Sequence, residues 1–220
     1  METPVITRDR VQTLCDKKFL RLYDLEYAEG KHYFNVSRRV TDELVCLKSA
    51  EEARAMLPDA VSCVVILARP DTEPRLLLSW EYRYPAGRYL LSVPAGLIDP
   101  EDRHLPQPLA ATASREMREE TGIVITAEDT VKVISPFLYS TPGMTDESNA
   151  LVLVVLRSAA PEQLNQDGAE GSECFDGFEL LTKAQAEDQL RSGRDKNGQF
   201  YSIYTWAALT WFVSGLWEKQ

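Results

Sequence analysis

Apolar residues follow strand-like spacing along most of the chain. Two alternating segments within residues 19–40 flank Glu29-Gly30 and predict a β-hairpin, because Gly accepts the backbone torsions of a tight turn. Short β-branched or apolar stretches predict further strands near residues 61–68, 75–83, 89–93, 130–134 and 151–156. This series predicts a mixed sheet preceded by a small N-terminal antiparallel β region.

Helix signals interrupt the strands at several places. Ser49 followed by Glu52 matches a capping box and predicts a short helix near residues 50–57. Thr182 precedes a second helical segment, KAQAEDQLRS. Residues 200–217 form an uncharged stretch of 18 residues, which is the length of a membrane helix. Its serines, threonines and aromatic side chains favour a helix packed on the sheet instead.

The clearest helix is expected over residues 109–121. Leu109, Ala113 and Met117 recur every four residues and form a narrow apolar stripe. Gly122 follows as a residue that can adopt left-handed torsions and end the helix. The opposite side of this helix is strongly acidic.

Three glutamates on that helix are candidate metal ligands. Glu116, Glu119 and Glu120 stand at i, i+3 and i+4, so their carboxylates share one side of the helix and repel each other. Mg²⁺ prefers oxygen ligands, so such a group beside a phosphate suits a divalent cation. Arg115 is placed to hold one of the carboxylates. A solvated acidic helix face is the simpler alternative.

Composition narrows the class of protein. The chain has 220 residues, 44% hydrophobic and 26% charged, which are ordinary values for one domain with a small accessory region. Its net charge is −10 and its pI is about 4.8, so it should repel nucleic acids and anionic membranes. A phosphorylated small molecule would need local cations or a divalent metal.

Histidine and cysteine usage excludes other chemistries. The two histidines, His32 and His104, offer little material for a zinc site. The four cysteines are far apart in the sequence and form no CxxC pair, which is typical of reduced thiols. The first 20 residues contain no apolar signal-peptide core. We therefore expect a cytoplasmic protein.

Residues 115–123, REMREETGI, resemble the signature of the Nudix hydrolases, REUxEExGU with U aliphatic, at every fixed position. The upstream half departs from the family pattern. Gly96 lies 19 positions before Arg115, five more than in the family, so an insertion is expected within residues 99–108. Gln107 stands where the family pattern has a glutamate that binds metal or orients the helix. This outer carboxylate is therefore either missing here or supplied by the nearby Glu101 or Asp102.

Three further segments resemble the ADP-ribose pyrophosphatase branch of this family. They are VPAGLID at 93–99, EYRYPAG at 81–87 and SPFLYSTPGMTDE at 135–147. The resemblance extends over about residues 17–212 and implies an α/β/α sandwich of the α+β class. It also implies an N-terminal region, 1–58, that forms a homodimer, and a Nudix domain over 59–220.

The resemblance implies hydrolysis of ADP-ribose or a related ADP-sugar to AMP and a sugar phosphate, with Mg²⁺ or Mn²⁺ as cofactor. The implied metal ligands are the carbonyl of Ala95 and the carboxylates of Glu116, Glu119 and Glu120, with Glu119 sharing metal or orienting water. Arg115 would hold the helix carboxylates. The general base would come from a mobile loop, where Glu173 is favoured over Glu170; an exposed carboxylate without a role is the alternative for both.

Substrate contacts are the least specific part of the prediction. Arg83 is expected to bind phosphate, unless it is a surface cation paired with Glu81 or Asp99. Gly96 is expected to approach the substrate closely. Met144 and Thr145 are implied to lie beside the terminal ribose. Trp80, or Tyr27 or Tyr33, is a candidate for stacking on adenine, with simple packing as the alternative.

Other functions remain open at this stage. They are the same chemistry on another nucleotide sugar or a dinucleotide, binding of ADP-ribose without turnover, and a plain acidic interaction domain. The intact glutamates disfavour a pure binder, since binding alone has no need of such a repulsive arrangement.

Overall fold

The computed structural model describes residues 3–169 and 171–219, which form two compact units. The first unit groups Met1–Asp59 with Phe137–Asn149, and the second groups Ala60–Pro136 with Ala150–Gln220. The segment Phe137–Asn149 thus groups with the N-terminal residues, whereas we expected it within the second domain.

The first unit is built on a three-stranded antiparallel sheet in the order β1-β2-β3. Its strands are β1 (Val11–Asp16), β2 (Arg21–Ala28) and β3 (Lys31–Ser37). Gly30 has a φ of +63° in the turn between β2 and β3, so the predicted hairpin is confirmed. The strand β1 was not predicted, because five of its six side chains are exposed and its apolar pattern is weak.

The same unit contains a short helix and a buried ion pair. Helix α1 (Ala50–Ala55) begins at Ser49 with the predicted capping box to Glu52. The buried guanidinium of Arg39 lies 2.9 Å from a carboxylate oxygen of Asp59 and 3.8 Å from one of Asp146. These contacts explain why the segment that contains Asp146 groups with the N-terminal residues.

The second sheet has seven strands. The order is β10-β5-β4-β9-β8, with β6 paired to β5 and β7 paired to β4. The strands are β4 (Ala60–Leu67), β5 (Arg75–Arg83), β6 (Arg88–Ser92), β7 (Ala95–Leu97), β8 (Thr130–Tyr139), β9 (Ser148–Leu156) and β10 (Phe175–Leu181). The sequence did not predict β7, which has only three residues, or β10, which contains Gly177 and a register shift.

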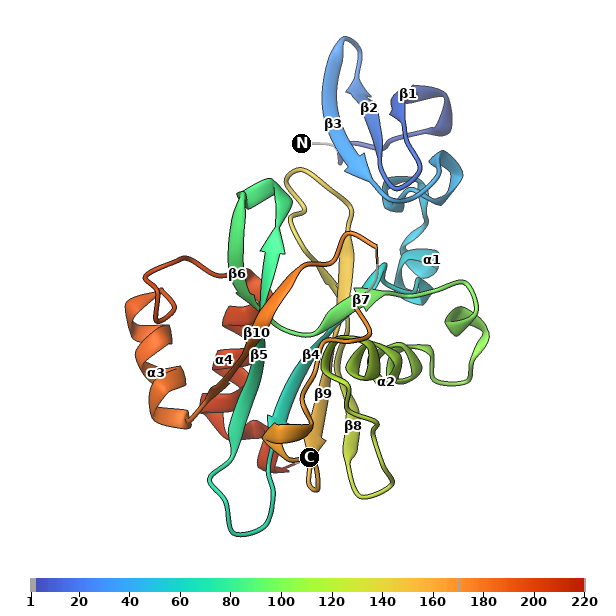
Figure 1. Cartoon of the computed structure of the whole chain (residues 1–220). Helices are drawn as coiled ribbons and strands as arrows, with labels where there is room; N and C mark the ends of the chain where they lie inside the picture. Colours follow the sequence, from blue (N-terminus) through green and yellow to red (C-terminus); the bar gives the residue numbers. More distant parts are fainter. Residues whose placement is uncertain (1–2, 170, 220) are drawn as a thin grey trace. The chain divides into compact units, whose positions relative to one another are not determined.

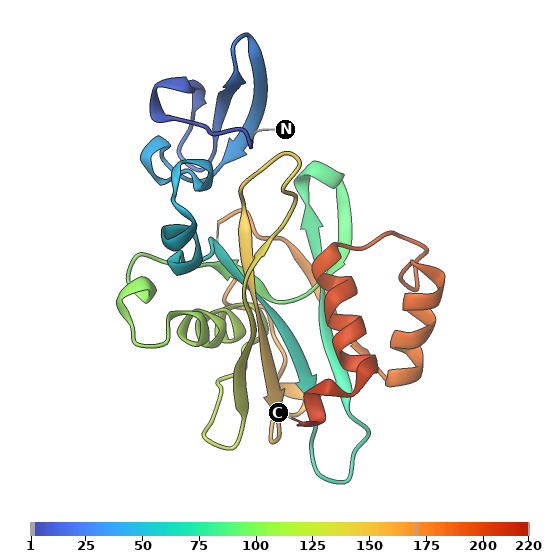
Figure 2. The same ribbon diagram turned by 180° about the vertical axis from the view of Figure 1, so that it is seen from behind.

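Helices cover both faces of this sheet. They are α2 (Pro108–Thr121), α3 (Lys183–Ser192) and α4 (Ile203–Ser214). Figures 1 and 2, which view the chain from opposite sides, show α2 on one side of the sheet and α4 on the other. The predicted α/β/α sandwich of the α+β class is therefore confirmed.

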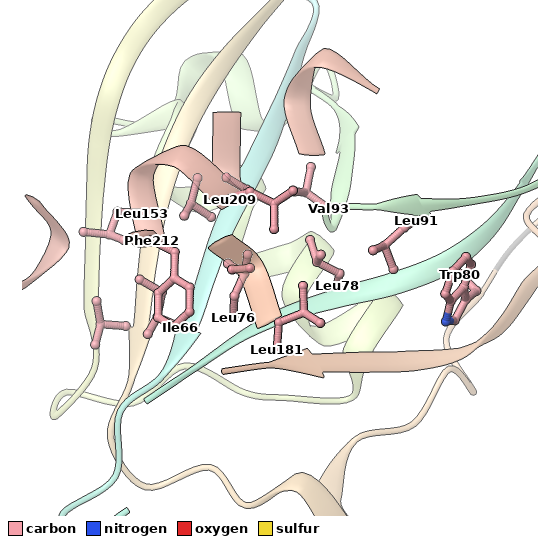
Figure 3. Close-up of a cluster of buried hydrophobic side chains, with 14 residues drawn as sticks. Ile66, Leu76, Leu78, Trp80, Leu91, Val93, Leu153, Leu181, Leu209 and Phe212 are labelled. Carbon is pink, nitrogen blue, oxygen red and sulfur yellow. The ribbon is translucent and has the colours of Figure 1, made fainter. Parts of the chain in front are cut away.

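One hydrophobic core lies on the α4 side of the sheet. Leu76, Leu78 and Trp80 of β5 belong to this core, together with Leu209 and Phe212 of α4 (Figure 3). Because side chains alternate along a strand, the odd-numbered residues of β5 face the α2 side. The core therefore fixes which residues of the sheet reach the acidic helix.

Helix α4 accounts for the uncharged stretch near the C-terminus. It has 12 residues, and Leu209 and Phe212 are buried in the core. The hydroxyl of Thr205 donates to the carbonyl of Leu91 at 2.7 Å and fixes the helix on β6. Among the residues the structure describes, no helix has both the length and the hydropathy needed to cross a membrane.

Candidate active site

Helix α2 carries two buried glutamates on the side that faces the sheet. Glu116 is 5% exposed and Glu120 is 3% exposed, whereas Glu119 is partly exposed. Met117 is fully buried on the same helix, and Gly122 ends it with a φ of +71°, as predicted. Two of the three glutamates of the predicted cluster are therefore largely removed from bulk water.

The short strand β7 lies against these glutamates. A Cβ atom built on Gly96 would lie 1.8 Å from Oε1 of Glu116, so only glycine leaves room for this carboxylate. The backbone N–H of Ala95 donates to Oε2 of Glu120 at 3.2 Å. The backbone of residues 95–96 and the two carboxylates therefore form one compact group of oxygen atoms and amides.

The positive charge of Arg115 compensates the negative charges of several carboxylates. Its guanidinium contacts Asp99 at 3.3 Å, Asp102 at 3.2 Å, Glu116 at 2.8 Å and Glu119 at 2.9 Å, and it donates to the Leu97 carbonyl at 2.8 Å. A guanidinium offers five N–H donors in a fixed plane, which suits several carboxylates at once. Arg115 thus pairs with both Glu116 and Glu119 of its own helix.

A carboxylate of the inserted segment contacts helix α2. Asp102 accepts hydrogen bonds from the hydroxyl of Thr112 at 3.0 Å and from Nε of Arg115 at 3.2 Å. Gln107, at the position of the family glutamate, precedes α2 and its side chain makes no capping hydrogen bond. Asp102 thus pairs with two side chains of α2, whereas Gln107 offers no carboxylate.

Burial changes the acidity of the group. Burial raises the pKa of Glu116 to about 7, with the Arg115 charge opposing the shift and the Glu119 charge adding to it. Burial also raises the pKa of Glu120, and the charges of Glu81 and Glu116 raise it further. The two buried carboxylates thus hold protons more tightly than free glutamate does, and a cation would favour their ionised forms.

These pKa shifts predict how metal-free stability varies with pH. A carboxyl group with a raised pKa binds more protons in the folded state, so unfolding free energy falls as pH rises. For Glu116 this loss should occur between about pH 4.5 and about pH 7. Thermal unfolding in chelator should show wild type losing stability relative to Glu116→Gln across this range. Saturating Mg²⁺ should abolish that relative loss, and parallel profiles in chelator would contradict the expectation.

The loop before β10 carries Glu173, the favoured candidate for the general base. Its charge contributes to the raised pKa values of Glu81, Glu116 and Glu120, after the larger effect of burial. Cys174 follows it, and its carbonyl accepts from the N–H of Tyr82 at 2.8 Å. Sheet pairing therefore anchors the residue next to Glu173.

The start of this loop is fixed against helix α2. The N–H of Asn165 donates to the carbonyl of Thr121 at 3.1 Å. A Cβ atom on Gly168 would lie 2.5 Å from the backbone oxygen of Glu119, so the loop passes very close to the helix. The alternative base, Glu170, lies outside the described residues.

Arg83 forms an ion pair with Glu81, which was the alternative to phosphate binding. Its Nη2 atom lies 2.5 Å from Oε2 of Glu81, while Asp99 pairs with Arg115 instead. The Arg83 side chain is 46% exposed and the Glu81 side chain is 13% exposed. The sequence did not single out Glu81 as a site residue, because one glutamate in a strand carries no recognisable motif.

The other predicted substrate contacts are Trp80 of β5 and residues of the first unit. Trp80 is 7% exposed and packs in the core on the α4 side of the sheet, which fits the packing alternative (Figure 3). Met144 and Thr145 belong to the first unit, where the N–H of Val36 donates to the Met144 carbonyl. Tyr33 is also there, and its hydroxyl donates to the Gly143 carbonyl at 2.6 Å.

The donor set fits a hard divalent cation. Glu116 and Glu120 offer carboxylate oxygens. Because Gly96 has no side chain, the Glu116 carboxylate can occupy the space beside its backbone. Within residues 3–169 and 171–219, no three acidic, histidine or cysteine side chains are already arranged around a common metal position. Small side-chain adjustments would therefore accompany metal binding.

The chain belongs to the Nudix family. The family model described as NUDIX domain matches residues 56–202, which include the acidic helix, β7 and the loop with Glu173. A solved structure titled "Crystal structure of ADP compounds hydrolase" has the same fold, with a TM-score of 0.57 and 19% sequence identity over 100% of this chain and 96% of that chain.

Several named relatives are similar over part of their length. An uncharacterised Nudix hydrolase of Schizosaccharomyces pombe is 30% identical over 131 residues, 59% of each chain. An ADP-ribose pyrophosphatase of Saccharomyces cerevisiae is 31% identical over 53% of this chain and 49% of its own. An ADP-sugar pyrophosphatase of Mus musculus is 35% identical over 44% of this chain and 41% of its own. The chain thus spans about half the length of these relatives.

Proposed function

We propose that this protein is a divalent-metal-dependent pyrophosphatase that hydrolyses ADP-ribose, or a related ADP-sugar, to AMP and a sugar phosphate. The observation that carries the proposal is the pair of buried glutamates, Glu116 and Glu120, packed against the backbone of Ala95 and Gly96. Its membership of the Nudix family and the names of its relatives support an ADP-linked substrate.

In the proposed reaction a water oxygen attacks one phosphorus of the diphosphate, and the bond from that phosphorus to the bridging oxygen breaks. A bound Mg²⁺ or Mn²⁺ would neutralise the diphosphate and make the attacking water more acidic. Glu116 and Glu120, with the Ala95 carbonyl, would hold this cation. Glu119 would share it or orient the water, and Arg115 would keep Glu116 and Glu119 in place.

Glu173 is the proposed general base, and its carboxylate would accept the proton of the attacking water. Glu173→Gln should therefore lower kcat by at least about 10²-fold with little change in KM. Steady-state kinetics of Glu173→Gln and Glu170→Gln would test this, with the nearby Asp176→Asn as a control that keeps near-normal rates. A large loss of kcat in Glu170→Gln alone would transfer the role to Glu170.

Arg83 is the proposed phosphate-binding cation on the substrate side. Its partly exposed guanidinium can bind two phosphate oxygens at once. The close backbone at Gly96 would leave room for the diphosphate next to Glu116. Met144 and Thr145 remain proposed contacts of the terminal ribose.

We also propose a homodimer formed through the N-terminal sheet. Large apolar side chains of this unit are exposed, including Leu14, Phe19, Leu20 and Phe34. Light scattering at micromolar concentration should give twice the mass of the 24.8 kDa chain. A monomer at that concentration would contradict the proposed homodimer.

The location of the protein is proposed from its cysteines. All four are free, which supports a reducing, cytoplasmic location.

A substrate panel tests the proposed activity. ADP-ribose, other ADP-sugars, GDP-sugars and dinucleotides would be incubated with Mg²⁺ and then with chelator, and products identified by chromatography. Metal-dependent release of AMP from ADP-ribose is expected. Faster turnover of a different nucleotide would identify that nucleotide as the substrate instead. Tight binding of ADP-ribose without turnover would show that the protein is a sensor and not an enzyme.

A further inference from the structure

Strand β5 brings an additional carboxylate to the active-site side of the sheet. Leu78 and Trp80 point into the core on the α4 side, so Ser79, Glu81 and Arg83 face the side of α2. Glu81 pairs in register with Leu90 of β6 and Phe175 of β10, which places it in the interior of the sheet. Its side chain is only 13% exposed.

Glu81 is closely coupled to the proposed metal ligands. Besides burial, its charge is the largest influence that raises the pKa of Glu120, ahead of the charge of Glu116. The charge of Glu173 in turn raises the pKa of Glu81. Glu81 thus lies on the side of the sheet that the acidic helix covers, although it comes from a different element.

Arg83 compensates Glu81 in the described structure. Its Nη2 atom lies 2.5 Å from Oε2 of Glu81, and the guanidinium also reaches solvent. A diphosphate that takes this guanidinium would leave the largely buried Glu81 without its cation, on the side of the sheet that also carries Glu116 and Glu120. That state is unfavourable unless a divalent cation enters with the diphosphate.

We propose that Glu81 is a positioning residue, an inference that rests on the proposed function. Glu81 holds Arg83 beside the carboxylates until a metal-bound diphosphate replaces Glu81 as the partner of Arg83. In this arrangement Glu81 makes substrate binding depend on the metal. Without metal, the substrate must break the Glu81–Arg83 pair and face an uncompensated charge. With metal, both costs are reduced.

Calorimetry with the non-hydrolysable α,β-methylene analogue of ADP-ribose tests the inference. In wild type, Mg²⁺ should strengthen binding strongly. In Glu81→Gln the metal-free affinity should rise, and the ratio of affinities with and without Mg²⁺ should fall by roughly fivefold or more. Glu81→Asp, which keeps the charge, should retain a ratio close to that of wild type.

A matched control lies on the other face of the same sheet. Glu179 pairs in register with Leu78, its side chain is 12% exposed, and it forms an ion pair with Lys196. Glu179→Gln therefore removes a similar buried charge away from the site and should leave the ratio unchanged. A fall in the ratio equal to that of Glu81→Gln would show a general effect and overturn the inference.

An Arg83→Met background separates positioning from simple repulsion. Without the guanidinium, Glu81→Gln should raise the metal-free affinity by less than it does in wild type. An equal gain in both backgrounds, or a wild-type ratio in Glu81→Gln, would overturn the proposed role. If wild type binds no analogue at all but turns over or binds another nucleotide, the ADP-ribose function fails; Glu81 is then tested in the same way with the non-hydrolysable analogue of that nucleotide.

Discussion

Glu120→Gln is expected to lower kcat for ADP-ribose by at least about 10²-fold while the protein remains folded. The substitution removes a proposed metal ligand that is 3% exposed, but keeps its size and its ability to accept the hydrogen bond from Ala95. Because burial and neighbouring acids raise the pKa of Glu120, replacing it with a neutral amide should not lower the melting temperature. Steady-state kinetics and thermal unfolding of the same preparation would measure both effects.

Glu179→Gln is the control for this measurement. It replaces a buried glutamate on the opposite face of the sheet, and its rate should stay within a few-fold of wild type. Near-normal turnover by Glu120→Gln at saturating Mg²⁺ would refute the role of this glutamate. A large loss of melting temperature would instead indicate that the carboxylate stabilises the fold.

Arg115→Met is expected to have the largest effect on stability. Arg115 contacts four carboxylates, and one of them, Glu116, is buried. Removing one partner of a buried ion pair leaves a charge without compensation, which costs about 3 kcal/mol or more. Chemical denaturation well above pH 7, where Glu116 must be ionised, should therefore show a much lower free energy of unfolding, and the loss should be smaller at lower pH, because the Glu116 carboxyl, whose pKa is about 7 even with Arg115 present, then takes up a proton. Activity should fall because Glu116 and Glu119 lose their orientation.

Combining this change with Glu116→Gln checks the reason. The neutral amide removes the stranded buried charge, so Arg115→Met in that background should be less destabilising than in wild type. An equal loss in both backgrounds would show that Arg115 stabilises the fold through Asp99 or Asp102 rather than through Glu116.

The sequence was most informative where local spacing decides structure. The four-residue repeat of apolar residues predicted α2 closely, and the glutamate spacing predicted which carboxylates share a side. The capping box at Ser49 and the turn at Gly30 were equally local signals. In each case one helix or one hairpin contains all the residues on which the prediction depends.

Features that depend on distant pairing were harder to predict. The short strand β7 is defined by its pairing with β4, and β10 contains an irregular register. Asp102 reaches Arg115 because the inserted segment folds back toward the helix, which no spacing rule describes. Glu81 joins the site through the alternation of β5 across a sheet, so its position depends on the fold rather than on a motif.

The most direct test of the metal site is a crystal grown with Mn²⁺ and the α,β-methylene analogue of ADP-ribose, measured for anomalous scattering. An anomalous peak is expected within about 2.0–2.3 Å of carboxylate oxygens of Glu116 and Glu120, next to the Ala95 carbonyl and the diphosphate. Bound analogue with no peak near these two glutamates would contradict the proposal that they hold the divalent ion.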